Sequence, residues 1–188
     1  MTLTVACVNH GDYLGRGHEY VRRMKSMVAR NLAQPYEFVV LQDEGSYGGW
    51  WSKIELFRPG RFKGRVLYLD LDSVAVGPLD LLAAQRGIID LRDWGWLTEV
   101  FGSGVMVWDG DEHREIFDRF DAGVARAYRG DQDWITELGG WEVLPAHLCR
   151  SYRYHCAAAP PEDCVHVSMH GNPKPHEILS GWVPGVWQ

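Results

Sequence analysis

Two carboxylates follow a run of apolar strand formers near the middle of the chain. Residues 65–69 read RVLYL, and Asp70 and Asp72 come shortly after them. On an extended segment, residues two apart project to the same side, so both side chains can present oxygens to one point. Such oxygens are typical ligands of a hard divalent cation, which can neutralise a bound diphosphate. A turn capped by Asp72 and Ser73 is an equal alternative from these residues alone.

The apolar pattern predicts an α/β fold that positions these carboxylates at one edge of a sheet. Strands are expected at residues 3–8, 37–41, 65–69, 87–91, 104–108 and 164–169, and helices at 18–33, 50–57, 111–127 and 131–138. Strands that alternate with helices indicate a mostly parallel central sheet flanked by helices. Ligands bind such sheets beyond the carboxyl ends of the strands, where Asn9, Asp43 and Asp70 are expected to gather. No repeat or linker is evident, so residues 1–188 are predicted to form a single domain.

The composition is that of a folded globular protein without a polyanionic partner. Of the 188 residues, 46% are hydrophobic and 23% charged, and the net charge is −6. This charge, without any run of Lys or Arg, argues against binding to nucleic acid or an anionic membrane surface. No run of about 18 apolar residues predicts a membrane span. Because the first residues lack the basic leader of a signal peptide, we expect a cytoplasmic protein.

The cysteines are irregularly spaced, at positions 7, 149, 156 and 164. The last three could hold zinc with nearby histidines, but no two of them have the spacing of a zinc knuckle. Free thiols of a cytosolic protein are the better interpretation.

Four segments, in order along the chain, resemble glycosyltransferase family 8 and its relatives with the GT-A fold. They are DLDSVAVGPLD at 70–80, FGSGVMVW at 101–108 with Gly102 in place of the usual Asn, DQDW at 131–134, and HGNPKP at 170–175. Each motif is weak alone, but their common order is specific. The resemblance implies a single GT-A domain with a Rossmann-like nucleotide-binding half. It also implies metal-dependent transfer of a sugar, with retention, from a nucleotide diphosphate donor, expected to be a UDP-sugar, to a glycan or small-molecule acceptor.

By this resemblance, Asp70 and Asp72 bind Mn²⁺ or Mg²⁺ on the donor diphosphate. The histidine that completes the family's metal site falls here on Ser168. His166 and His170 are the nearest imidazoles, and we expect His170 to complete the site, which would favour manganese. An ordinary hydrogen-bonded histidine remains the alternative.

The resemblance assigns further contacts to the donor. The expected residues are Asn9, Asp12, Tyr13, Lys53, Asp70, Ser103, Gly104, Gly171 and Lys174. Lys174 would pair with the diphosphate, and the ring of Tyr13 could stack on the nucleobase. Helix capping is an equal alternative for Asp12. Next to Lys53, Trp50 and Trp51 are interpreted as core and cleft wall.

Asp131, Gln132 and Asp133 are the catalytic candidates, because the resemblance places them at the sugar and acceptor. The amide of Gln132 is a poor nucleophile, so front-face attack and a nearby carboxylate both remain open. A purely structural role is also open, with Asp131 capping a helix and Asp133 interacting with its dipole.

Two other functions compete with sugar transfer. Residues 69–74, LDLDSV, also resemble the nucleophile strand of haloacid dehalogenase-type phosphatases. That fold expects this motif on its first strand and a later acidic pair, which the sequence does not offer. A non-catalytic nucleotide-sugar or glycan-binding module of the same fold is the stronger alternative, and it would lack metal-dependent donor hydrolysis. No motif indicates the sugar, the acceptor or the oligomeric state.

Overall fold

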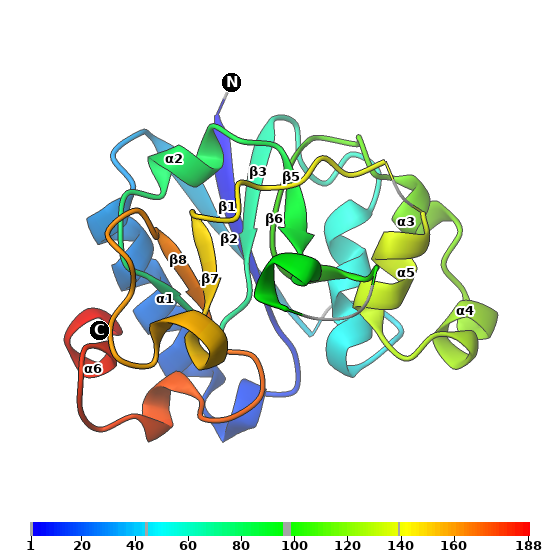
Figure 1. Ribbon diagram of the computed structural model, residues 1–188. Coiled ribbons are helices and arrows are strands. Elements are labelled where there is room, and N and C mark those ends of the chain that lie inside the picture. The colour runs from blue at the N-terminus through cyan, green and yellow to red at the C-terminus, as the bar shows by residue number, and fades with distance from the viewer. Residues whose placement is uncertain (1, 44, 96–98, 139) are drawn as a thin grey trace.

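The computed structural model describes residues 2–43, 45–95, 99–138 and 140–188, and a five-stranded sheet lies at its centre (Figure 1). The strands are β1 (Leu3–Asn9), β2 (Tyr36–Gln42), β3 (Arg65–Leu69), β5 (Gly87–Asp90) and β6 (Phe101–Asp109), in the spatial order β2-β1-β3-β6-β5. β1 is parallel to β2 and β3, whereas β6 is antiparallel to β3 and β5. The other four strands therefore share one direction and β6 is reversed, so the mostly parallel α/β sheet is confirmed with one antiparallel strand.

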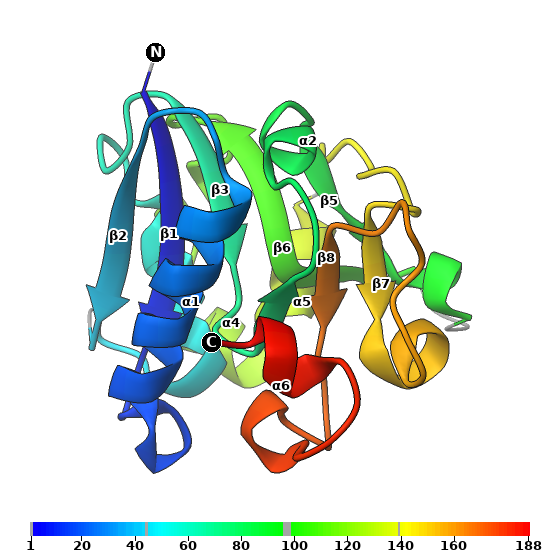
Figure 2. The same ribbon diagram turned by 90° about the vertical axis from the view of Figure 1, so that its left-hand side faces the viewer.

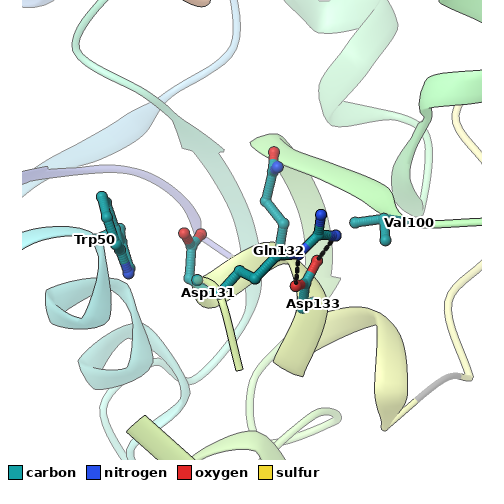
Figure 3. Close-up of a pocket in the computed structure, with 7 residues that line it drawn as sticks. Trp50, Val100, Asp131, Gln132 and Asp133 are labelled. Atoms are coloured by element: carbon teal, nitrogen blue, oxygen red, sulfur yellow. Dashed lines mark hydrogen bonds and ion pairs between the residues drawn. The ribbon is translucent and has the colours of Figure 1, made fainter. Parts of the chain in front are cut away.

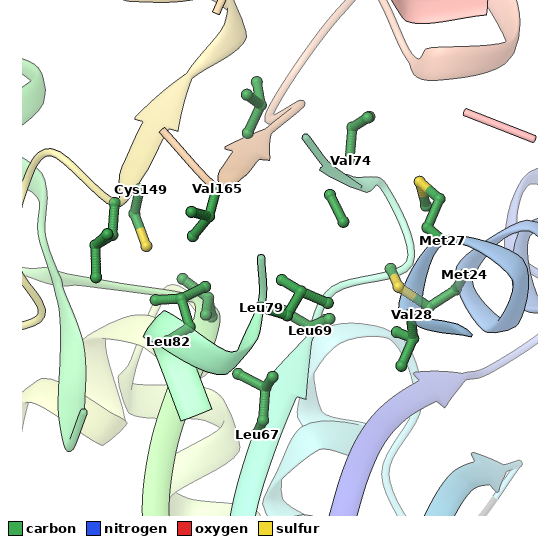
Figure 4. Packing of buried hydrophobic residues seen from close by; sticks show 14 of the residues in the cluster. Met24, Met27, Val28, Leu67, Leu69, Val74, Leu79, Leu82, Cys149 and Val165 are labelled. Atoms are coloured by element: carbon green, nitrogen blue, oxygen red, sulfur yellow. The ribbon is translucent and has the colours of Figure 1, made fainter. Parts of the chain in front are cut away.

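Alternating residues of β3 reach two hydrophobic clusters on opposite faces of this sheet. Leu67 and Leu69 join the cluster that contains helix α1 (Gly17–Asn31). Val66 and Tyr68 join the other, with the 3-10 helix η2 (Gly49–Phe57) and helix α5 (Asp131–Glu137). Figure 4 shows the first cluster, in which residues of α1 and β3 meet Val74. Because both faces are buried, the strands contain apolar residues at nearly every position.

A second, three-stranded sheet lies on the α1 side (Figure 2). It consists of β4 (Ser73–Ala75), β8 (His166–Ser168) and β7 (Cys149–Ser151), in the order β4-β8-β7. Ser73 faces Ser168 across the antiparallel pair, and Ser168 faces Ser151 across the parallel one. β4 directly follows the Asp70–Asp72 turn, so this sheet brings the C-terminal motif back to the acidic segment.

The predicted helix over residues 111–127 is wrong as a single element. The structure has two short helices there, α3 (Glu115–Asp118) and α4 (Ala122–Ala127). The carboxylate of Asp121 accepts hydrogen bonds from the N–H groups of Gly123 at 2.7 Å and Val124 at 3.0 Å. This N-cap begins a new helix and interrupts the amphipathic pattern. The helices predicted at 18–33, 50–57 and 131–138 correspond to α1, η2 and α5.

The remaining helical elements are short connections. They are α2 (Asp80–Ala83), α6 (Val183–Val186), 3-10 turns at Tyr13–Gly15, Leu91–Trp94 and Pro175–Glu177, and a π-helical turn at Tyr152–Cys156. Among the described helices, none combines the length and apolar character needed to cross a membrane. All four cysteines are buried free thiols.

Candidate active site

Asp70 lies at the carboxyl end of β3 and is held from two elements. Its N–H donates to the carbonyl of Gly104 on β6 at 2.8 Å. Its carboxylate oxygens lie 2.9 and 3.1 Å from Nζ of Lys53 on η2. The hydroxyl of Tyr68, two residues back on the same face of β3, donates to it at 2.5 Å. Burial, and then the Asp70 carboxylate, raises the pKa of Tyr68 well above its ordinary value, so this hydroxyl stays a donor.

Asp72 contacts residues from the first loop and from the C-terminal motif. Its carboxylate accepts a hydrogen bond from the Tyr13 hydroxyl at 2.9 Å and one from Nζ of Lys174 at 2.5 Å. Burial, and next the Asp72 charge, raises the pKa of Tyr13, which therefore remains protonated. Asp70 and Asp72 line two cavities together, one of about 320 Å³ with Tyr13 and Lys53 and one of about 120 Å³.

Lys53 connects this acidic pair to the Asp-Gln-Asp motif. Its side chain is only 13% exposed, and Nζ lies 3.3 Å from Asp131 and 3.1 Å from the Ser103 hydroxyl, besides its contact with Asp70. Burial lowers the pKa of Lys53, but the carboxylates of Asp131 and Asp70 raise it by more, and the net shift is upward. One ammonium group therefore holds the buried Asp131 and the half-buried Asp70, two acids from segments far apart in the sequence.

The Asp-Gln-Asp motif forms the first turn of α5. Asp131 is buried and accepts a short hydrogen bond from the Ser103 hydroxyl, while Oε1 of Gln132 accepts from the Ser103 N–H at 3.3 Å. Asp133 is paired instead with Arg129, at 2.8 and 3.1 Å. These residues line a third cavity, of about 370 Å³, with Trp50 and Val100 (Figure 3). Gln132 also lines the 120 Å³ cavity, so it lies between the acidic pair and the larger space.

The side chains fit a divalent cation only in part. In the described ranges, no group of three or more His, Cys, Asp or Glu side chains is arranged to hold a metal ion. Asp70 and Asp72 each hold a lysine instead. This set does not fit a resident ion enclosed by protein ligands. It fits an ion that takes one or two carboxylates from the protein and its other ligands from phosphate and water, as Mg²⁺ commonly does.

The expected third ligand, His170, has other partners. Its Nε2 is hydrogen bonded to the Ser151 hydroxyl at 2.7 Å, and its ring stacks on Trp94 and on Tyr154, with centroids 5.3 and 5.7 Å away. Burial, ahead of the neighbouring charges, lowers the pKa of His170. The ring nevertheless lines the 120 Å³ cavity with both aspartates. His170 thus lies next to the acidic pair. It is hydrogen bonded to a serine, as expected of an ordinary structural histidine.

Two residues of β8, His166 and Ser168, have buried polar atoms without a hydrogen-bond partner in the described structure. These atoms are the Ser168 hydroxyl and both ring nitrogens of His166. A Cβ added to Gly104 would lie 3.3 Å from Oδ2 of Asp70 and 3.7 Å from Oγ of Ser168. The small residue therefore keeps the space between these two oxygens open.

Two predicted donor residues shape the first loop. The Asn9 amide donates to Gln42 at 2.8 Å and accepts from the Tyr13 N–H at 3.1 Å. Asp12 accepts from the N–H of Gly17, the first residue of α1, at 2.8 Å, although the N-cap residue of this helix is Arg16. Gly171 is exposed, with φ +69°, in the turn before Lys174. Of the predicted residues of the first loop, Tyr13 is the one that bonds to the acidic pair.

Sequence reasoning missed Tyr68, His10 and Arg129. Tyr68 could have been found, because it is two residues before Asp70 on the same strand face. His10 lines the 320 Å³ cavity, and Arg129 the 370 Å³ cavity. Neither stands in a recognisable pattern.

Several solved structures that share this architecture are glycosyltransferases. GlyE of Streptococcus pneumoniae aligns over 99% of this chain and 59% of its own length, with a TM-score of 0.66 and 14% identity. LgtC, solved in complex with donor and acceptor sugar analogs, aligns over 93% of this chain and 89% of its own, with a TM-score of 0.58 and 15% identity. This chain has a glycosyltransferase fold.

A third match extends the same result. A glycosyltransferase involved in the glycosylation of the major capsid of PBCV-1 aligns over 92% of this chain and 95% of its own, with a TM-score of 0.62 and 12% identity. No protein-family model and no curated protein matches the sequence. The GT-A-type fold expected from the four motifs is therefore confirmed by structure. The chain spans 59% of the length of GlyE.

Proposed function

We propose that this protein is a glycosyltransferase that takes a sugar from a nucleotide diphosphate donor, expected to be a UDP-sugar, and passes it to a glycan or small-molecule acceptor. The observation that carries the proposal is the contact between Lys174 and Asp72, which joins two separate motifs beside the cavities that Asp70 and Asp72 line, one of which Gln132 also lines. The shared fold with glycosyltransferases supports it. A cleft with these charges suits a diphosphate that carries a divalent cation.

The donor diphosphate is proposed to lie between the acidic pair and Lys174. Asp70 and Asp72 would hold Mn²⁺ or Mg²⁺, which when bound supplies positive charge to the departing nucleotide. Lys174 supplies a second positive charge to the same phosphates. Tyr13, already hydrogen bonded to Asp72, provides a ring beside the nucleoside. His170, which lines the 120 Å³ cavity with both aspartates, is the imidazole proposed to lie next to the cation. Gly104 leaves room for the donor.

The sugar is proposed to reach Asp131 and Gln132. Asp131, fixed by Ser103 and Lys53, accepts hydrogen bonds from sugar hydroxyls. In the transfer step, the acceptor oxygen bonds to the anomeric carbon, the bond from that carbon to the diphosphate oxygen breaks, and the acceptor proton leaves with the diphosphate. Asp70, Asp72 and Asp131 all carry a lysine partner, which weakens each as a nucleophile. With the configuration retained, as the family resemblance implies, this favours attack on the front face over a covalent intermediate.

The decisive test measures donor binding and donor hydrolysis. A panel of nucleotide sugars, UDP-glucose and UDP-galactose among them, is screened by thermal shift with and without Mn²⁺. Free ligand at about 100 times its dissociation constant adds about 2.7 kcal/mol to stability. Release of UDP is then followed with the donors that bind. Binding by the wild type without any hydrolysis or transfer would favour the non-catalytic binding module, and no binding with any divalent ion would refute both.

Asp72→Asn is the matched variant. We expect it to keep the fold, because the amide oxygen can still accept from Tyr13 and Lys174, and to lose about 100-fold or more in donor hydrolysis through the missing charge. Circular dichroism and the melting temperature without ligand check the fold. Asp118→Asn, on α3 away from the cleft, should hydrolyse the donor like the wild type. Equal rates in Asp72→Asn and wild type would remove the assigned role of the acidic pair.

A further inference from the structure

Trp50 is an exposed aromatic residue at the mouth of the cleft. Its exposed fraction is 57%, and among the tryptophans in the described ranges it is the one that is exposed; the others are buried or half-buried. An indole left in water forgoes the stabilisation that burial of such a large apolar surface gives. At the mouth of a cleft, this ring is free to pack against a ligand.

The helical geometry of η2 explains why Trp50 faces the cleft and Trp51 does not. Residues three apart eclipse one another on a 3-10 helix, so Trp50 lies on the same side as Lys53. Both line the 320 Å³ cavity. Trp51 turns to Phe120, with ring centroids 5.0 Å apart, and lines a different cavity next to α3. The adjacent tryptophans thus separate into one structural ring and one ring left open to solvent.

Trp50 belongs to two adjoining cavities. It shares the 320 Å³ cavity with the acidic pair and the 370 Å³ cavity with Asp131, Gln132 and Asp133. A Cβ added to Gly130 would lie 3.5 Å from the indole Nε1, 3.6 Å from Cδ1 and 3.7 Å from Cε2, so the residue before α5 lies beside the five-membered ring. Figure 3 shows Trp50 on one side of the larger cavity and Asp133 on the other, with Asp131 and Gln132 between them.

The two walls of this cavity differ in a way that suits a pyranose ring. A pyranose has a face of C–H groups and an equatorial edge of hydroxyl groups. Trp50 offers a flat apolar surface to the first. Across the cavity, the Arg129–Asp133 ion pair offers N–H donors and carboxylate acceptors to the second. A volume of about 370 Å³ lies within the range of small-molecule sites.

We propose that Trp50 is the stacking face of a subsite for the acceptor, a pyranoside, in the 370 Å³ cavity. The Arg129–Asp133 pair binds its hydroxyls, and Gln132 separates it from the acidic pair. The inference rests on the proposed function and adds to it a substrate class and a specificity residue that none of the four motifs contains. The donor diphosphate takes the other side of the same indole.

The first test is a binding measurement that needs no catalysis. Saturation-transfer difference NMR is recorded with methyl β-D-glucopyranoside and methyl β-D-galactopyranoside on the UDP-loaded full chain. We expect the strongest transfer to the C–H protons of one sugar face in the wild type, its loss in Trp50→Ala, and partial retention in Trp50→Phe. Trp51→Phe is the matched control and should behave like the wild type. No transfer from either glycoside in the wild type, or an unchanged signal in Trp50→Ala, overturns the inference.

The second test separates acceptor from donor. In the transfer assay, Trp50→Ala should raise KM for the methyl glycoside by about tenfold, the upper end for an aromatic contact, and raise KM for the nucleotide sugar by less. An equal rise in both KM values would assign the ring to the donor and overturn the inference. Donor hydrolysis with unchanged glycoside binding in Trp50→Ala would leave the proposed function intact and this inference wrong. Glycoside binding lost in Trp50→Ala, in a protein that cleaves no nucleotide sugar, would refute the proposed function alone.

Discussion

The two acidic motifs of the cleft differ in how firmly they are held. Asp70 and Asp72 receive bonds from η2, from β3 itself, from the first loop and from the C-terminal turn that carries Lys174. The Asp-Gln-Asp motif lies on a single helical turn. Its first acid, Asp131, is buried with Ser103 and Lys53, but its last, Asp133, pairs with an arginine side chain that is 84% exposed.

This difference matches what each side is proposed to bind. A diphosphate has the same charge and shape in every nucleotide sugar, so a preorganised set of charges serves it well. The hydroxyls of sugars and acceptors vary in position. The cavity of the Asp-Gln-Asp motif offers them the exposed ring of Trp50 and the Arg129–Asp133 ion pair. Among the described residues, Lys53 is the one whose side chain is ion-paired to both motifs.

Lys53→Met should give the largest effect. The substitution leaves the buried Asp131 and the half-buried Asp70 without their shared cation. Removing one partner of a buried ion pair typically costs about 3–5 kcal/mol, because the remaining charge is uncompensated. We therefore expect a loss of unfolding free energy of about 3 kcal/mol or more, measured by urea denaturation.

Lys63→Met is the matched control, since Lys63 is exposed. Its unfolding free energy should stay within about 0.5 kcal/mol of the wild type. If both variants unfold at the same urea midpoint, the ion pairs of Lys53 do not stabilise the contact between the acidic pair and the Asp-Gln-Asp motif.

His166, on β8, should make the unfolding free energy depend on pH. Burial lowers the pKa of His166 to about 4, although Asp70 acts in the opposite direction. Between this value and the ordinary pKa of about 6.5, the unfolded chain binds a proton that the folded chain does not. The stability that the neutral ring contributes is therefore complete above pH about 6.5 and declines as the pH falls, by about 3 kcal/mol in total at pH about 4.

The measurement is the slope of unfolding free energy against pH over this window. His166→Gln should flatten the slope, whatever its effect on stability at neutral pH. His18→Gln changes an exposed histidine on α1 and should keep the wild-type slope. A slope that persists in His166→Gln would place the pH dependence in other groups.

The sequence predicted the parts of the molecule that depend on local patterns. Apolar runs located the five strands of the central sheet and β8, but not the short strands β4 and β7. Asp70 and Asp72 were expected to share one side of an extended segment, and they lie instead in a turn that follows β3. The direction of β6 was beyond such reasoning, because an apolar run has the same pattern in parallel and antiparallel pairing when both faces are buried. The break between α3 and α4 was readable in principle, since Asp121 is an N-cap residue within an otherwise amphipathic segment.

The charges of the site depend on tertiary contacts, and these the sequence did not reveal. Lys53 was expected at the diphosphate, but its bond to Asp131 requires η2 and α5 to pack side by side. His170 was expected at a metal, but its bond to Ser151 depends on β7 lying next to β8. Partners so far apart in the chain leave no periodic signal. Recognition of motifs can therefore indicate which residues gather, and their pairing has to come from the structure.

Asp133→Asn should have the smallest effect on stability. The carboxylate pairs with exposed Arg129 one helical turn away, and such pairs contribute little because water and salt screen them. We expect a urea midpoint indistinguishable from that of the Lys63→Met control, with any residual difference from wild type removed by high salt. Asp131→Asn, in the same helical turn, should lower the midpoint clearly, since it removes a buried partner of Lys53. If Asp133→Asn were as destabilising as Asp131→Asn, Asp133 would be held as firmly as the acidic pair. The proposed contrast between a preorganised diphosphate site and an exposed acceptor site would then be wrong.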